Sequence, residues 1–395
     1  MKKIQDAQFY LRKINVDGWL IYDFHGNNEL GHQFLELPIH MKPTRRFFYW
    51  IPSHGDPVKL VHAIESGILD SYPGEKRTFL SWESLNHQLE NLLKGVKRIA
   101  MEYSPNNMIP YVSKVDAGTM DLVRSFGIEV VSSGEFLPYF TAVISNEQGL
   151  SHIRAGRQLD RIVNDAWVMI ADHLKKGQMI TDLDVQKKIM SEFVHANLVT
   201  NGPPIIGVNA TSADPHYNNS INKSVLIKHG DFLLIDLWAK ENQPKSIYAD
   251  ITRVAVAAER PTEKQKMIFG FVRQAQKAAT ELVMNRFAQK KEICGWEVDE
   301  CARKVIRDAG YGEFFLHRTG HSIEESVHGS GANMDNFEMH DVRPILASTC
   351  FSIEPGIYLP GEFGVRLEYD LYVHRNCNVE VVGGEQNEIP SIFIV

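Results

Sequence analysis

Short apolar and alternating runs along the first 145 residues predict strands separated by helices. The β-type runs cover residues 18–22, 46–50, 58–61, 98–101 and 128–131, and an amphipathic helical pattern covers 82–93. Strands that alternate with helices are typical of one sheet covered by helices. We therefore predict an α/β domain over residues 1–145. This stretch does not concentrate the residue types that usually carry catalysis.

A change to long helical periods near residue 145 predicts a second domain over residues 146–395. The two halves together predict an α+β protein. The elements expected in the second domain are helices over 153–174 and 182–193, a hairpin over 231–239 and 246–257, helices from 261 and 296, and β-type runs over 313–323, 350–359 and 365–373.

Composition is that of a globular protein, with 395 residues of which 44% are hydrophobic and 23% charged. The formal charge of −7, without a dense basic stretch, argues against nucleic acid as a partner. The start is polar and the longest apolar runs, such as 232–235, are too short to cross a bilayer, so we expect no signal peptide, no membrane span and a cytoplasmic location. The four cysteines form no C-x-x-C pair and predict neither a disulfide framework nor a zinc knuckle.

Two carboxylates inside apolar strands are the most informative feature of the second domain. Asp236 lies in Leu-Leu-Ile-Asp-Leu-Trp, and Asp250 lies in Ile-Tyr-Ala-Asp-Ile-Thr on the other strand of the predicted hairpin. An ionised carboxylate buried without a partner costs many kcal/mol, so each needs a cation or hydrogen-bond donors. The hairpin can bring the two side chains together, which would make half of a metal site.

His321, Glu354 and Glu368 offer the other half of such a site. Glu354 precedes a Pro-Gly turn that would end its strand, and the two-residue period places Glu368 on one strand face with Arg366 and Asp370. Four carboxylates and one imidazole suit two divalent ions. Any one of these acids alone is more often a salt-bridge or turn partner, but five such positions in one domain favour metal binding.

Five segments in this order resemble the metal-site motifs of the M24 metallopeptidases, which include methionine aminopeptidase, aminopeptidase P and Xaa-Pro dipeptidase (prolidase). The resemblance implies a pita-bread catalytic domain preceded by a smaller creatinase-like N-terminal domain, although the N-terminal part carries no comparable motif. The segments are 230–236 (Gly-Asp-Phe-Leu-Leu-Ile-Asp), 250–253 (Asp-Ile-Thr-Arg), 317–321 (His-Arg-Thr-Gly-His), 352–358 (Ser-Ile-Glu-Pro-Gly-Ile-Tyr) and 364–368 (Gly-Val-Arg-Leu-Glu).

The resemblance also implies a role for each ligand. Asp236 would chelate one metal, Asp250 and Glu368 would bridge both, and His321 and Glu354 would bind the other. In the family a metal-bridging hydroxide attacks the scissile carbonyl, and the carboxylate matching Glu354 serves as general base.

Five further residues match family positions around the ligands. Histidines at three of them would donate hydrogen bonds to the substrate and the tetrahedral intermediate. The other two match residues implicated in proton shuttling and in holding the bridging ligands. The histidines are His216, His317 and His328, and the other two are Tyr358 and Arg366.

The segment after His321 departs from the family pattern, reading Ser-Ile-Glu-Glu where Gly-x-Gly is usual. Glu324 and Glu325 place negative charge near the expected substrate entrance, where they would favour an ammonium group on the substrate or simply face solvent. The separation from Asp236 to Asp250, 250 − 236 = 14 residues, is longer than usual. Extra residues at a hairpin tip change loop shape without moving the ligands.

These observations predict a dinuclear metal-dependent exopeptidase that hydrolyses the Xaa-Pro bond of dipeptides or short peptides. The resemblance suggests Mn²⁺ or Co²⁺, with Zn²⁺ or Fe²⁺ as alternatives, and a homodimer. A dipeptidase needs a cation for the proline carboxylate, and Arg318, Arg343 and Arg366 are candidates. The alternatives are aminopeptidase P-type cleavage of longer peptides and an M24-related hydrolase or lyase acting on a small non-peptide substrate. Retention of all five ligands disfavours metal-free creatinase-like chemistry and a non-enzymatic binding module.

Overall fold

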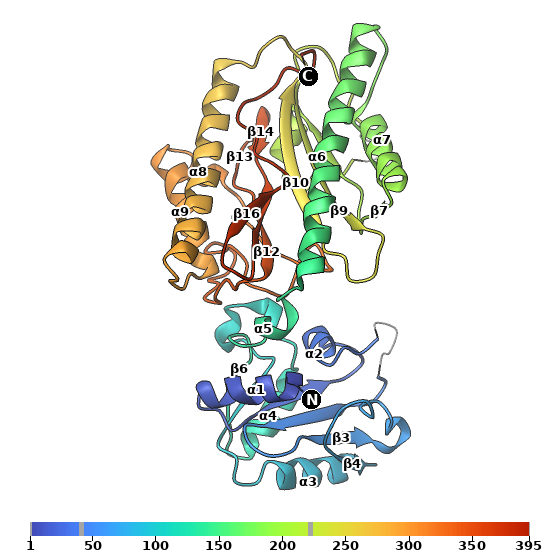
Figure 1. Cartoon of the computed structure of the whole chain (residues 1–395), viewed down its shortest axis with the longest axis vertical. Coiled ribbons are helices and arrows are strands. Elements are labelled where there is room, and N and C mark those ends of the chain that lie inside the picture. Colours follow the sequence, from blue (N-terminus) through green and yellow to red (C-terminus); the bar gives the residue numbers. More distant parts are fainter. Residues whose placement is uncertain (1, 39–42, 220–223, 395) are drawn as a thin grey trace. The chain divides into compact units, whose positions relative to one another are not determined.

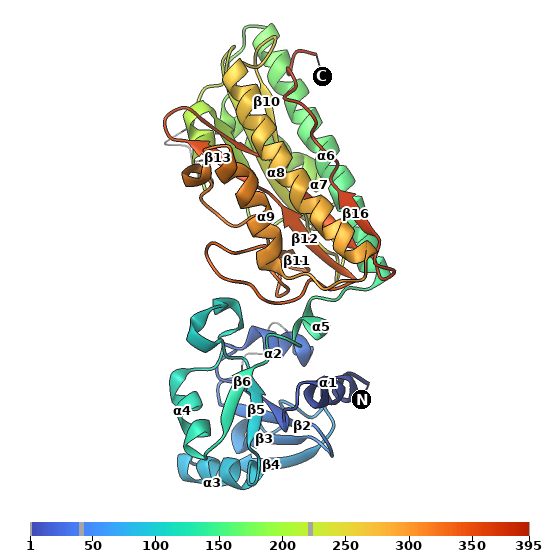
Figure 2. The ribbon, with the colours of Figure 1, turned by 90° about the vertical axis from the view of Figure 1, so that its left-hand side faces the viewer.

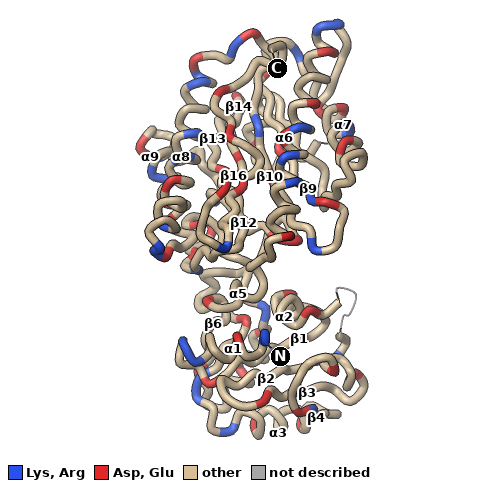
Figure 3. Tube along the Cα trace, in the orientation of Figure 1, with Lys and Arg blue, Asp and Glu red and all other residues tan. Residues whose placement is uncertain are grey.

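The computed structural model describes residues 2–38, 43–219 and 224–394. The chain divides into two compact units, Met1–Thr141 and Ala142–Val395 (Figure 1). Acidic and basic residues are interspersed along both units (Figure 3). Among the described residues, no helix has both the length and the apolar character that a bilayer crossing requires.

The first unit is built on a six-stranded sheet in the order β4-β3-β2-β1-β5-β6. In β1 the side chains alternate, so that Trp19 and Ile21 join the core on one face while Leu20 and Tyr22 join the core on the other. The predicted strands and helix of this unit are present, and β4 is an additional edge strand whose polar sequence gave no strand signal. The elements are α1 Lys2–Lys13, β1 Gly18–Asp23, α2 Glu29–Phe34, β2 Phe47–Pro52, β3 Val58–His62, β4 Glu75–Phe79, α3 Trp82–Leu92, β5 Arg98–Met101, α4 Ala117–Ser125, β6 Glu129–Ser132 and α5 Pro138–Thr141.

Glu102, directly after β5, is a buried carboxylate that ties three parts of the first unit together. Its Oε1 accepts hydrogen bonds from Trp19 Nε1 at 2.6 Å and Ser133 Oγ at 3.1 Å. Its Oε2 accepts one from Asn28 Nδ2 at 2.7 Å, and Asn28 is the N-cap of α2. Burial raises the pKa of Glu102 to about 7 in spite of these three donors.

We expect Glu102 to make the stability of the first unit fall as the pH rises. A carboxyl whose pKa is higher in the folded state stabilises the fold at low pH, and this contribution disappears between about pH 4.5 and 7. A pKa shift of this size lowers the free energy of unfolding by roughly 3 kcal/mol across that pH window. Urea unfolding of wild type and Glu102→Gln across pH 5 to 8 measures the effect. The difference in unfolding free energy between the two proteins should decline toward pH 7 and then level off, and a difference independent of pH would refute the assignment.

The second unit packs helices against two groups of strands (Figures 1 and 2). Helices α6 and α7 share a core with β8, β9 and β10, and α8 and α9 share one with β12 to β15. The elements are α6 Asn146–Lys175, α7 Asp182–His195, β7 Leu198–Val199, β8 Ile205–Val208, β9 Phe232–Glu241, β10 Ala249–Val256, α8 Glu263–Ala288, α9 Gly295–Asp308, β11 Ser322–Ile323, β12 Thr349–Ile353, β13 Gly356–Leu359, β14 Phe363–Arg366, β15 Tyr369–Val373 and β16 Val379–Val382.

The two-residue period of the β9–β10 hairpin decides which side chains reach the site. Leu233, Ile235 and Leu237 of β9 pack against α6 and α7. Phe232 and Leu234, which lie on the opposite face, pack in the core that includes α8 and α9. The even-numbered positions therefore point away from α6, and the two strand aspartates are both even-numbered.

Three predicted β-type runs differ from the observed elements. The run 313–323 is a strand only at Ser322–Ile323, because its backbone is bound by groups distant in sequence: Thr319 N donates to Met334 O at 3.0 Å and to Asp299 Oδ1 at 2.9 Å. The run 350–359 breaks between β12 and β13 at the expected Pro-Gly turn. The run 365–373 breaks after Arg366, so the prediction that Glu368 lies within one continuous strand is wrong.

Candidate metal centre

The β9–β10 hairpin places Asp236 and Asp250 on one face as diagonal neighbours. Asp236 lies opposite Thr252, and Asp250 lies opposite Trp238, so the two aspartates are one pleat apart on paired strands. Both side chains are buried. The long hairpin tip lies beyond Asp250 and leaves this register intact.

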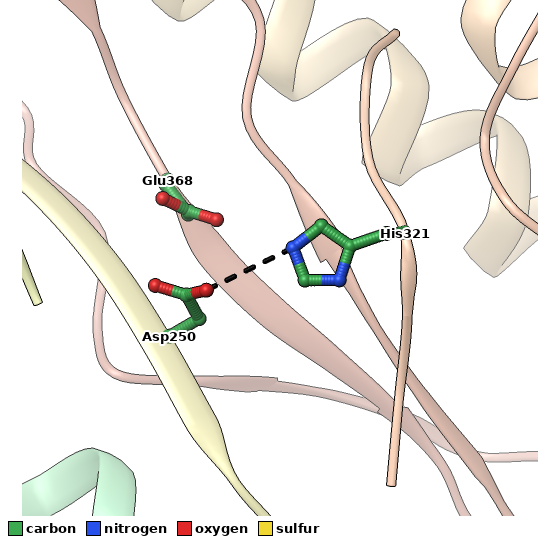
Figure 4. Close-up of side chains that lie close together, drawn as sticks. All are labelled: Asp250, His321 and Glu368. Atoms are coloured by element: carbon green, nitrogen blue, oxygen red, sulfur yellow. Dashed lines mark ion pairs between the residues drawn. The ribbon is translucent and has the colours of Figure 1, made fainter. Parts of the chain in front are cut away.

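Two hydrogen bonds with Ser352 fix the backbone of His321. Its N–H donates to Ser352 Oγ at 3.0 Å, and its carbonyl accepts from Ser352 N at 2.9 Å. The ring Nδ1 lies 3.2 Å from Ser322 O, so Nδ1 carries the proton and Nε2 presents a lone pair. That Nε2 lies 3.7 Å from Asp250 Oδ2 (Figure 4). It also lies 3.5 Å from Glu354 Oε1.

Glu354 and Glu368 reach the same region from the breaks between strands. Glu354 N donates to Thr319 O at 2.7 Å, and Ser352 Oγ donates to Glu354 Oε1 at 3.1 Å. Glu368 bridges to the hairpin, where its Oε2 accepts from Thr252 Oγ1 at 2.6 Å. The two strand breaks therefore turn these carboxylates toward the hairpin aspartates.

Asp250, His321 and Glu368 fit a divalent cation. Each offers one ligand atom, and these atoms lie within 4.8 Å of one another (Figure 4). Asp250 Oδ1 is buried and has no hydrogen-bond partner in the described structure. Burial raises the pKa of Asp250 well above its usual value, and the charges of Glu368 and Asp236 raise it further. An orphaned oxygen in such a crowded group is best satisfied by a cation.

The imidazole of His321 leads to the same conclusion. Burial holds the pKa of His321 well below its usual value, so the ring is neutral near pH 7. A neutral ring that points a lone pair at two carboxylates has no attractive partner there. A metal ion between these groups would bind all of them.

Asp236, the other hairpin aspartate, is joined to the cluster through Arg366 rather than directly. Its Oδ2 accepts a short hydrogen bond from Arg366 Nη2 in a buried ion pair. Arg366 Nε donates to Thr252 Oγ1 at 3.0 Å and lies 4.0 Å from Glu368 Oε2. Burial raises the pKa of Asp236, and the charges of Arg366 and His216 oppose that rise.

His317, Tyr358 and Arg366 form a hydrogen-bonded chain beside the carboxylates. His317 Nδ1 lies 2.7 Å from Arg318 O and therefore carries the proton, so Nε2 accepts from Tyr358 Oη at 2.6 Å. Arg366 Nη1 donates to the same hydroxyl oxygen at 3.1 Å. Burial lowers the pKa of His317 to about 3 and raises that of Tyr358 to about 12, so both are neutral near pH 7.

The other two predicted histidines lie at the rim of the cluster. The His328 ring is 4.4 Å from the His321 ring, edge to face, and burial lowers the pKa of His328 to about 4. His216 is exposed and lies in the turn after Asp214, whose Oδ1 accepts from His216 N at 3.1 Å. The charge of His216 acts on the cluster through Asp236 and His328.

Glu324 differs from the prediction that it places charge near the substrate entrance. Its side chain is buried, and its Oε1 accepts hydrogen bonds from Ser330 N at 2.8 Å and Gly331 N at 3.0 Å. Glu325, the next residue, is exposed. Glu324 is therefore bound within the loop, because backbone donors six and seven residues later in the chain fold back onto its carboxylate. Of the two acids, only Glu325 faces solvent.

Two carboxylates and one hydroxyl support the site, and none of them is assigned a role there from the sequence. Asp370 Oδ2 accepts from Asp250 N at 2.8 Å. Asp299 of α9 accepts from Thr319 N and, at 2.6 Å, from Thr319 Oγ1. Thr252 links Arg366 to Glu368. Only Asp370, two residues after Glu368, could have been found, as a second buried carboxylate in an apolar run.

The fold and the cluster define a two-domain protein with a candidate centre for divalent metal ions. Residues 154–375, more than half of the chain, match the metallopeptidase family M24. The protein belongs to this family. It is 32% identical over 214 residues to the Xaa-Pro dipeptidase of Lactobacillus helveticus, covering 54% of this chain and 52% of that protein. The chain thus spans about half the length of the curated relatives it matches.

Solved structures resemble the protein along almost its whole length. The prolidase of Pyrococcus horikoshii OT3 matches with a TM-score of 0.61 at 22% identity, covering 98% of this chain and 100% of that one. Dipeptidase PepE of Mycobacterium ulcerans matches with a TM-score of 0.70 at 22% identity, covering 98% of this chain and 97% of that one. These matches confirm the predicted fold, a pita-bread domain preceded by a smaller α/β domain.

Proposed function

We propose that the protein is a dinuclear metal-dependent exopeptidase that hydrolyses the Xaa-Pro bond of dipeptides. The observation that carries this proposal is the buried cluster of Asp250, His321 and Glu368, which holds a carboxylate oxygen, Asp250 Oδ1, with no hydrogen-bond partner among the described residues. The other oxygen of the same carboxylate, Oδ2, lies 3.7 Å from the lone pair of His321 Nε2. Membership of family M24 and the likeness to Xaa-Pro dipeptidases give the substrate class.

Five side chains would hold the two metal ions: Asp236, Asp250, His321, Glu354 and Glu368. Bound divalent ions would polarise the scissile carbonyl and lower the pKa of water. Oxygen-rich sites with one imidazole suit several divalent ions, and we propose Mn²⁺ or Co²⁺ as the active ones. A homodimer and a cytoplasmic location stay predictions.

Glu354 is suited to accept and return the proton of the attacking water. Burial raises its pKa to about 7, although the charges of Arg366 and Arg318 oppose the rise. In the metal-free protein, a carboxyl with this pKa exchanges a proton readily near neutral pH. Ser352 Oγ donates to Oε1 and so fixes the carboxylate, which leaves Oε2 to take the proton.

The neutral histidines would stabilise the charge that develops on the substrate oxygen. His328, with its low pKa, keeps one N–H and can donate it without bringing a positive charge into the cluster. His317 holds the Tyr358 hydroxyl in place, and Arg366 donates to that hydroxyl from the other side. The hydroxyl is thereby oriented beside Glu354 and Asp236, whose charges act on its pKa.

We propose that Arg318 binds the carboxylate of proline. Its charge acts on His321, His328 and Glu354, so its guanidinium lies close enough to the cluster to influence these three groups. A guanidinium can bind a carboxylate through two parallel hydrogen bonds.

Release of proline from matched Xaa-Pro dipeptides and Xaa-Pro-Xaa tripeptides by manganese-loaded protein tests the proposed function. We expect cleavage of the dipeptides, with little cleavage of tripeptides because the carboxylate that Arg318 would bind is then on another residue. Cleavage of tripeptides instead would identify an aminopeptidase P-type enzyme. Failure to cleave either series, by protein shown to carry two metal ions, would refute the peptidase proposal and favour a small non-peptide substrate.

A further inference from the structure

The loop of residues 322–331 follows one histidine of the candidate site and contains another. His321 lies directly before this loop, and His328 lies within it with its ring 4.4 Å from the His321 ring. The loop is closed at its base by a hydrogen bond from Gly329 N to Ser322 O at 2.7 Å. The position of His328 therefore depends on what holds the two ends of this loop together.

Glu324 is the side chain that joins the two ends. Its Oε1 accepts from Ser322 Oγ at 3.2 Å on one side, and from Ser330 N at 2.8 Å and Gly331 N at 3.0 Å on the other. Ser330 Oγ lies 3.1 Å from Oε1 and 3.0 Å from Oε2. The carboxylate thus satisfies two backbone N–H groups that the loop would otherwise leave without a partner.

The backbone of Glu324 is fixed as well, so the side chain acts from a rigid position. Its carbonyl accepts from Tyr248 N at 3.0 Å, and its N–H donates to Ser326 O at 3.0 Å. Gly329 lies so close that a Cβ there would be 2.7 Å from the Glu324 carboxylate carbon and Oε1. The residue that follows His328 is therefore packed directly against this carboxylate.

We propose that Glu324 is a positioning residue that holds His328 in the orientation needed to contact the substrate. The proposal rests on the proposed function, since it assigns the purpose of the loop in that reaction. This role of Glu324 also explains the departure from the usual Gly-x-Gly sequence, because in this protein a carboxylate holds the two ends of the loop together by hydrogen bonds. Glu324 itself touches neither the substrate nor the reacting atoms.

Glu324→Ala is expected to lower kcat/KM for an Xaa-Pro dipeptide by about 10- to 100-fold, the usual effect of losing a supporting contact. Glu324→Gln keeps an acceptor oxygen toward Ser330 N and Gly331 N and should stay within about threefold of wild type. Glu325→Gln, which removes the neighbouring exposed charge, is the matched control and should have no effect.

A double-mutant cycle separates positioning of His328 from general destabilisation. In a His328→Ala background, Glu324→Ala should add less than about threefold to the loss, because the group it positions is already absent. A full additional loss in that background would overturn the proposal.

Side-chain NMR of metal-free protein labelled with ¹⁵N-histidine gives a readout that does not need activity. The His328 signals are identified by their absence from His328→Ala. They should shift in Glu324→Ala and stay in place in Glu324→Gln and Glu325→Gln. Unchanged signals in Glu324→Ala would refute the positioning role even if the wild type is active, whereas an inactive wild type with the expected shifts would refute only the peptidase function.

Discussion

Asp250→Ala is expected to lower kcat/KM for Xaa-Pro dipeptides by about 10³-fold or more, because the variant lacks the carboxylate at the centre of the cluster. Asp250 contributes to the group of three ligand atoms within 4.8 Å, and its Oδ1 has no other partner among the described residues. Loss of this side chain should also weaken metal binding, so the variant should hold less than two ions per chain.

The thermal stability of a second variant, Asp250→Asn, in its metal-free form distinguishes loss of metal binding from misfolding. Burial and the charges of Glu368 and Asp236 raise the pKa of Asp250, so the carboxylate is unfavourable in the empty site. Metal-free Asp250→Asn should therefore unfold at the same temperature as metal-free wild type or higher, while losing the stabilisation that Mn²⁺ gives the wild type. Glu241→Gln at the far end of β9 is the control, and equal loss of activity there would contradict a specific role for Asp250.

Removal of the metal ions should abolish hydrolysis and lower the thermal stability of the wild type. A ligand at a hundred times its dissociation constant stabilises a protein by about 2.7 kcal/mol per site. Two such sites in a unit of this size correspond to a change in Tm on the order of 10 °C. Differential scanning calorimetry before and after chelation, and after addition of Mn²⁺, measures the change. Activity that survives complete chelation would contradict metal-dependent hydrolysis.

The strands that carry the aspartates were predictable because the sequence signal is local. Both strands of the hairpin have the two-residue period, and each contains one acid among apolar residues, which is how Asp236 and Asp250 were found. The Pro-Gly pair after Glu354 likewise predicted the turn between β12 and β13. These features depend on neighbours within a few positions along the chain.

The supporting contacts were not predictable because they join distant segments. The carboxylate of Asp299 in α9 holds Thr319, so residues 313–321 are not a strand despite their apolar content. The burial of Glu324 depends on donors at Ser330 and Gly331, and a charged pair in sequence gives no sign of them. The pairing of Arg366 with Asp236 joins residues that are 130 positions apart.

Anomalous diffraction from crystals of manganese-loaded protein locates the metal ions independently of any assay, and so shows whether the five side chains form a dinuclear centre. We expect two manganese peaks among Asp236, Asp250, His321, Glu354 and Glu368, with Arg366 displaced from Asp236 or sharing it with an ion. A single peak, or no peak within this cluster in crystals of protein that is active in solution, would contradict a dinuclear centre.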